Sequence, residues 1–124
     1  MRFVPYPEDE ALKSGLLLHA ALLRAEGQEE LSAARFAEAA ALEEMLAERA
    51  DTEGNALRAI RSQFSAASAW ANAGDFHHAL TLLQILEQRD DAPEALKARA
   101  RAFADTLRSQ RRHWHSTLQE AGLT

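Results

Sequence analysis

Residues 63–93, QFSAASAWANAGDFHHALTLLQILEQRDDAP, contain two apolar periodicities that are separated by a short break. On both sides of Gly74 and Asp75, apolar residues recur every three or four positions, which is the spacing of an amphipathic helix. Glycine commonly follows the last residue of a helix, and aspartate commonly precedes the first residue of the next. The stretch therefore predicts a helical hairpin with its bend at Gly74 and Asp75.

The same periodicity continues through the rest of the chain and predicts a fold of the all-α class. The expected helices lie at about 9–26, 28–49, 55–73, 75–88 and 92–120. No segment shows the strict alternation of a strand. We expect a single domain over residues 1–124, with residues 1–8 extended because Pro5 and Pro7 disfavour helix before them. Two antiparallel hairpins and a long C-terminal capping helix fit this pattern.

The pattern of small and aromatic residues in 63–93 resembles a tetratricopeptide repeat. Two small residues are followed by an aromatic residue, and the second helix has an alanine with a large apolar residue four positions later. These positions are held by Ala66, Ala67, Trp70, Ala79 and Leu83. A weaker match covers 14–47, through Ala20, Leu23, Gly27, Ser32, Phe36 and Ala39. The chain departs from the family at Gln63, where the family has a tryptophan, and at Pro93, which lies two residues late.

This resemblance implies a protein-protein interaction module, such as an adaptor, a scaffold or a chaperone-type binder, without catalytic activity. In such repeats, side chains of the first helices line a concave groove that holds a peptide. The corresponding positions here are Leu17, Ala21, Arg61, Phe64, Ser68 and Asn72. The alternative is that Leu17 and Phe64 belong to the core. An apolar groove would be covered by the last helix, by a second copy or by a partner's helix. A homodimer is therefore one of the alternatives.

The charge of the chain is unevenly distributed along the sequence. The net charge is −5, but residues 1–54 have 12 acidic and 5 basic residues, and residues 55–124 have 7 and 9. General affinity for nucleic acid is not expected of an acidic chain, because that affinity depends on neutralising phosphates. The last predicted helix nevertheless has a basic stripe, formed by Lys97, Arg101, Arg108 and Arg112. It could bind an acidic peptide, RNA or the acidic half of another copy, or it could be an ordinary solvated face.

Nothing in the sequence indicates a catalytic residue, a cofactor site or a metal site. His77 and His78 point about 100° apart on a helix, and His113 and His115 diverge further, so neither pair suits chelation. The H-E-x-x-H motif, a phosphate-binding glycine loop and a nucleophile elbow are all missing, and there is no cysteine. We therefore expect no enzyme. A small nucleic-acid-binding or regulatory protein is the alternative function, and a site built from histidines of separate helices is a third.

The sequence favours a cytoplasmic location. No apolar run approaches the roughly 20 residues that a membrane-spanning helix needs. The N-terminus MRFVPYPEDE does not have the basic, apolar and small-residue order of a signal peptide. The expected partner is therefore another protein or a peptide, and no contact with membrane is expected.

Overall fold

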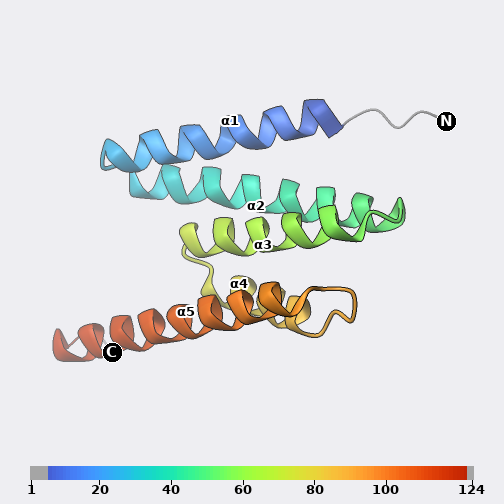
Figure 1. Cartoon of the computed structure of the whole chain (residues 1–124). Coiled ribbons are helices and arrows are strands. Elements are labelled where there is room, and N and C mark those ends of the chain that lie inside the picture. The colour runs from blue at the N-terminus through green and yellow to red at the C-terminus, as the bar shows by residue number, and fades with distance from the viewer. Residues whose placement is uncertain (1–5, 123–124) are drawn as a thin grey trace.

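The computed structural model describes residues 6–122, and within that range every regular element is a helix (Figure 1). The five helices are α1 (Tyr6–Ala25), α2 (Glu29–Thr52), α3 (Ala56–Asn72), α4 (Phe76–Glu87) and α5 (Glu94–Glu120). The expected all-α class is confirmed. The bounds agree with those expected from the sequence to within about one turn.

The N-terminal segment differs from the expectation. Residues 6–8 were expected to be extended, but α1 begins at Tyr6, and residues 1–5 lie outside the described part of the chain. Pro7 is compatible with the first turn because the N–H that it lacks would have no partner inside the helix. Glu8 and Asp9 in the same turn interact favourably with the positive end of the helix dipole.

Three of the four connections have the same geometry. A glycine with positive φ follows each of the first three helices, at Gly27, Gly54 and Gly74, with φ values of 79°, 78° and 86°. At the first connection the amide of Gln28 donates to the carbonyl of Leu23 at 2.9 Å, and the same bond recurs at the other two. This is the hydrogen bond of a Schellman cap, which favours glycine because side chains are strained at positive φ. The repeated cap reverses the chain in three residues each time.

These tight turns place consecutive helices antiparallel and side by side (Figure 1). Each helix packs against the one before it and the one after it, from α1 on α2 to α4 on α5. Side chains also join alternate helices: Glu10 of α1 bonds Arg58 of α3, and Phe64 of α3 stacks on Phe103 of α5. On the other side, His78 of α4 contacts Glu44 of α2. Thus α1, α3 and α5 share one face of the stack, and α2 and α4 share the other.

Alanine dominates the interior of the stack. Of the 21 buried hydrophobic residues in the described chain, 13 are alanines. The larger side chains that are fully buried are few and include Ile60, Leu83, Leu86 and Leu107, which form one cluster between α3, α4 and α5. Because alanine projects little beyond the backbone, neighbouring helices can approach closely.

The fourth connection is longer and is fixed by a side chain. Arg89 donates to both carboxylate oxygens of Asp51 at the end of α2, at 2.9 and 3.0 Å, and to Asp91 within the loop. A further bond reaches Gln63 on α3 at 3.1 Å. The carboxylate of Asp91 therefore bonds Arg89 and does not cap α5. The N-cap residue of α5 is Pro93, whose side chain forms no hydrogen bond.

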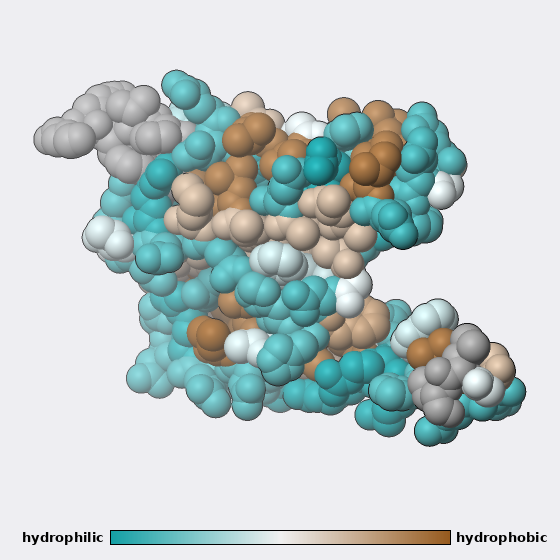
Figure 2. Space-filling view, turned by 180° about the vertical axis from the view of Figure 1, so that it is seen from behind, coloured by the Kyte–Doolittle hydropathy of each residue, from teal (hydrophilic) through white to brown (hydrophobic). Residues whose placement is uncertain are grey.

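The last helix extends past the helix against which it packs. α4 has 12 residues and α5 has 27, and the buried residues of α5 are Ala100, Ala104 and Leu107. From residue 108 to residue 122 no side chain is buried, and only Leu118 is even half-buried. We call residues 108–122 the α5 overhang. Figure 2 shows it standing clear of the rest of the molecule, with a notch between the two.

Truncation of Leu83 is expected to destabilise the stack because this side chain is fully buried in the cluster between α3, α4 and α5. Leu83→Ala should lower the free energy of unfolding by about 2–5 kcal/mol. Leu57→Ala is the matched control, since Leu57 is 50% exposed, and it should change stability by less than about 1 kcal/mol. Urea denaturation followed by circular dichroism measures both, and equal effects would contradict the assigned core.

Candidate interaction surface

A groove runs along α3 on the face that α3 shares with α1 and α5. It consists of three open clefts of about 240, 220 and 370 Å³ that lie end to end, because adjacent clefts share lining residues. The first two share Lys13, Glu43 and Ser65, and the last two share Ser68 and Asn72. We call this the α3 groove. Its lining includes Lys13, Leu17, Arg24, Glu43, Arg58, Arg61, Ser65, Ser68, Asn72, Phe103 and Gln110.

Four of the six positions suggested by the family resemblance line this groove, namely Leu17, Arg61, Ser68 and Asn72. Ala21 is exposed but is not part of the lining. Phe64 is half-buried and stacks on Phe103, with ring centroids 5.9 Å apart. The geometry thus places Phe64 in the packing between α3 and α5, and the binding role of all six residues stays a prediction.

Arg24, at the end of α1, fixes one wall of the α3 groove. Its guanidinium donates to the backbone carbonyl of Asn72 at 2.7 Å and to the side-chain oxygen of the same residue at 3.2 Å. It also lies 4.8 Å from the centroid of the Phe36 ring and 3.3 Å from a carboxylate oxygen of Glu29. The sequence pattern did not single out Arg24, because its main partner lies 48 residues away in the chain.

Charged groups are bonded to one another at the opposite end of the groove. The ammonium of Lys13 lies 2.6 Å from Glu10 and 3.4 Å from Glu43, and Arg58 donates to Glu10 at 2.9 Å. Burial raises the pKa of Glu43, and the nearby Lys13 opposes this only in part. Burial also acts on Glu10, but the bonds from Lys13 and Arg58 outweigh it and hold the pKa of Glu10 below its usual value. Both carboxylates of the groove are thus already engaged by cations.

The two adjacent histidines have different surroundings. His77 is exposed, whereas the imidazole of His78 stacks on the indole of Trp70, with centroids 4.1 Å apart. One carboxylate oxygen of Glu44 lies 2.8 Å from Nε2 of His78 and accepts a hydrogen bond from Trp70 Nε1 at 2.6 Å. Glu44, Trp70 and His78 therefore join α2, α3 and α4 on the face opposite the α3 groove.

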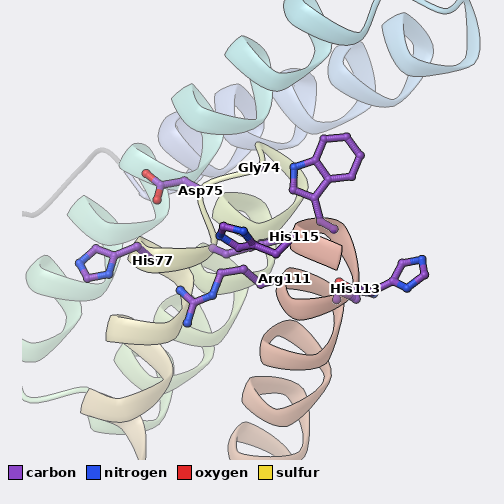
Figure 3. Close-up of a pocket in the computed structure, with 9 residues that line it drawn as sticks. Gly74, Asp75, His77, Arg111, His113 and His115 are labelled. Atoms are coloured by element: carbon purple, nitrogen blue, oxygen red, sulfur yellow. The ribbon is translucent and has the colours of Figure 1, made fainter. Parts of the chain in front are cut away.

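A larger cleft of about 720 Å³ lies between the first turn of α4 and the α5 overhang. It meets the α3 groove at Gly74, Phe76 and Gln110, which line both. Figure 3 shows Arg111 and His115 on the side of α5 that faces His77, whereas His113 points away. Trp114 also lines the cleft, and 59% of its surface is exposed.

The basic stripe expected on the last helix is interrupted by acidic groups. Lys97 lies 3.8 Å from Glu94, and Arg108 lies 3.2 Å from Asp105. Arg101 and Arg108 share a shallow cleft with Glu87 and Asp105. The fourth residue, Arg112, is exposed on the α5 overhang. These four residues are not gathered into one uninterrupted positive surface.

Residues 6–122 contain neither a metal-binding cluster nor a helix suited to cross a membrane. No three histidine or carboxylate side chains in that range are grouped closely enough to hold a metal ion. Likewise, none of the helices there combines the length and apolarity needed to cross a membrane. Comparison of the chain with protein-family models, curated proteins and solved structures finds no match.

Replacement of Glu43 by glutamine is expected to change how stability depends on pH. Because the folded-state pKa of Glu43 is raised, the folded protein keeps a proton at pH values just above 4.5 that the unfolded chain has released. The free energy of unfolding therefore falls as pH rises through the folded pKa, and Glu43→Gln removes that fall. Urea midpoints measured at a series of pH values from 4.5 upward test this.

Glu10→Gln is the control for this measurement. The pKa of Glu10 is lowered in the folded state, so its contribution to stability is lost as pH falls below the ordinary glutamate pKa of 4.5. The effect of Glu43 is instead lost as pH rises above that value. If wild type and Glu43→Gln had parallel pH profiles above 4.5, the assigned environment of Glu43 would be wrong.

Proposed function

We propose that this chain is a protein-interaction module whose α3 groove binds an extended, acidic peptide segment of another protein. The observation that supports this proposal is the chemistry of the groove. Its carboxylates, Glu10 and Glu43, are engaged by Lys13 and Arg58, whereas Arg61 is exposed at the groove and Arg24 is half-buried in its wall. A peptide in the groove would therefore meet guanidinium, hydroxyl and amide groups rather than free carboxylates.

The dimensions of the groove favour an extended ligand. The groove follows α3, whose 17 residues span about 25 Å at 1.5 Å per residue. A peptide in extended conformation rises about 3.3 Å per residue, so about seven residues match this length. Ser65 and Ser68 lie one helical turn or less apart along it and offer hydroxyl groups that can both donate to and accept from a peptide backbone.

Charge would select the ligand. The chain as a whole has a net charge of −5, so an acidic partner is repelled in general and attracted only where cations are exposed. Arg61 at one end of α3 is such a site, and Arg99, whose guanidinium lies 5.4 Å from the centroid of the Phe64 ring, is a second cation on the same side. Complementary charge of this kind raises association rates and disfavours wrong partners.

No catalytic step is part of this proposal. Membership among tetratricopeptide-like proteins and a cytoplasmic location belong to it as well. The tetratricopeptide-like relationship is supported by the paired antiparallel helices and by the family-like residues of 63–93, with Ala66, Ala67 and Ala79 buried in the hairpin.

Selection from a display library of random seven-residue peptides is the direct test. Peptides retained by the purified protein should be enriched in aspartate and glutamate, and their affinity should fall as salt is raised. Arg61→Glu should weaken a selected peptide by about tenfold or more, equivalent to about 1.4 kcal/mol, because it places like charge beside the ligand.

Arg101→Glu is the matched control, since Arg101 is an exposed arginine on α5 outside the α3 groove. It makes the same change in net charge and should leave the affinity within about twofold, a difference of less than 0.5 kcal/mol. Equal losses in the two variants, or selected peptides without acidic enrichment, would reject the α3 groove as the binding site.

A further inference from the structure

α1 is the first helix of the stack, and its outward side has almost no charge. Between residues 11 and 25 its exposed positions are alanine, leucine, serine, glycine and one histidine. Leu12, Leu18 and Leu22 are each more than half exposed. Apolar residues along this edge of the molecule are visible in Figure 2. We call this surface, centred on Leu18, the α1 outer face. End units of stacked-helix proteins normally have a polar outer side, and within residues 6–122 nothing covers this apolar face.

The α5 overhang is the second surface without a partner. Its apolar stripe is formed by Trp114 and Leu118, and it continues the stripe that α4 covers up to Leu107. An extension of a helix into solvent gains no tertiary packing, although such packing supplies most of the stability of helices in proteins. Arg111 and Arg112 flank the stripe and form no ion pair within residues 6–122.

The two surfaces match each other in length and in charge. The α1 outer face covers 15 helical residues, 11–25, and the overhang has 13 helical residues, 108–120, so they span about 22 and 20 Å of helix. The α1 outer face is bordered by exposed carboxylates, Glu8 at one end and Glu26 and Glu30 at the other. The overhang has Arg108, Arg111 and Arg112 against Glu120 alone, so it is basic.

This distribution of charge disfavours pairing of like surfaces. Two α1 outer faces would bring their acidic ends together, and two overhangs would bring two surfaces of net positive charge together, so both arrangements are repulsive. An α1 outer face against an overhang joins apolar residues to apolar residues and acidic groups to basic groups. The overhang of one molecule cannot reach its own α1 outer face, because α1 and α5 lie at opposite edges of the stack (Figure 1).

We propose that the partner of both surfaces is a second copy of this chain, in a two-fold dimer in which each α5 overhang packs on the α1 outer face of the other copy. Two-fold symmetry makes the contact twice and leaves neither surface exposed, whereas an open chain of copies would leave one of each at its ends. Trp114 is the central anchor, since it is 59% exposed and tryptophan is enriched among the residues that contribute most to binding. The α3 groove borders the overhang at Gln110, but its lining residues on α2 and α3 belong to neither of the two surfaces.

Molar mass in solution tests the proposal. Wild type should have about twice the chain mass of 13.7 kDa at micromolar concentration, and the dimer should weaken as salt is raised. Leu18→Glu with Leu22→Glu should give a monomer, and Trp114→Ala with Leu118→Ala should also give a monomer. Unchanged helical circular dichroism is expected for both, because these residues are exposed or half-buried.

The pattern across the variants is decisive. Loss of the dimer only in the α1 variant would indicate pairing of α1 outer faces, and loss only in the Trp114 variant would indicate pairing of overhangs; either result overturns the proposal. A monomeric wild type, or species larger than a dimer, overturns it as well. Leu57→Glu, at an exposed leucine of α3 outside both surfaces, is the control and should remain dimeric.

Cross-linking between introduced cysteines supplies an independent measurement. It is specific because the chain has no cysteine of its own. Ser14→Cys places a thiol on the α1 outer face, and Thr117→Cys places one on the α5 overhang, both at exposed positions. A short bismaleimide should join the two proteins when they are mixed with different tags, and it should join neither to itself. Self-linking of either single variant without linking between the two would reject the proposed contact.

Discussion

Burial of alanine between neighbouring helices is the constraint on which the rest of this structure depends. Buried alanines occur in all five helices, for example Ala20, Ala47, Ala66, Ala79 and Ala104. Small side chains let backbones approach but fill little space, so each helix packs on its neighbours instead of around a common core. The arrangement is a stack, and a stack has two ends. The leucines that the alanine contacts leave outside are the ones that make the α1 outer face apolar.

The small side chains of the interior also explain why ion pairs join α1 to α2 and α3. Lys13 reaches from α1 to Glu43 of α2, and Glu10 reaches from α1 to Arg58 of α3, in a region where few large apolar side chains are available. A buried ion pair adds little net stability, but loss of one partner leaves an uncompensated charge. These pairs therefore oppose any sliding of α1 along its neighbours, and they leave the α3 groove with engaged carboxylates and an exposed arginine.

The sequence was sufficient for the helices and for most turns, because those signals are local. Gly27, Gly54 and Gly74 each end a helix within a few residues of where the periodicity stops. The side-chain contacts could not be predicted in this way. The period of α2 puts Glu44 on the outward side, yet Trp70 and His78 from the next two helices bond it. Whether Phe64 lines a groove or packs against α5 depends on where α5 lies, which no local pattern encodes.

The difference in length between α4 and α5 determines how far α5 extends beyond the rest of the stack. α4 has 12 residues and covers α5 only as far as Leu107, which leaves the 13 helical residues 108–120 exposed. Each turn added to α4 would shorten that exposed stretch by about 5.4 Å, and each turn removed would lengthen it by the same amount. In the proposed dimer, such changes in length would alter the spacing between the two copies in steps of one helical turn, with the buried alanines of α1, α2 and α3 unaltered.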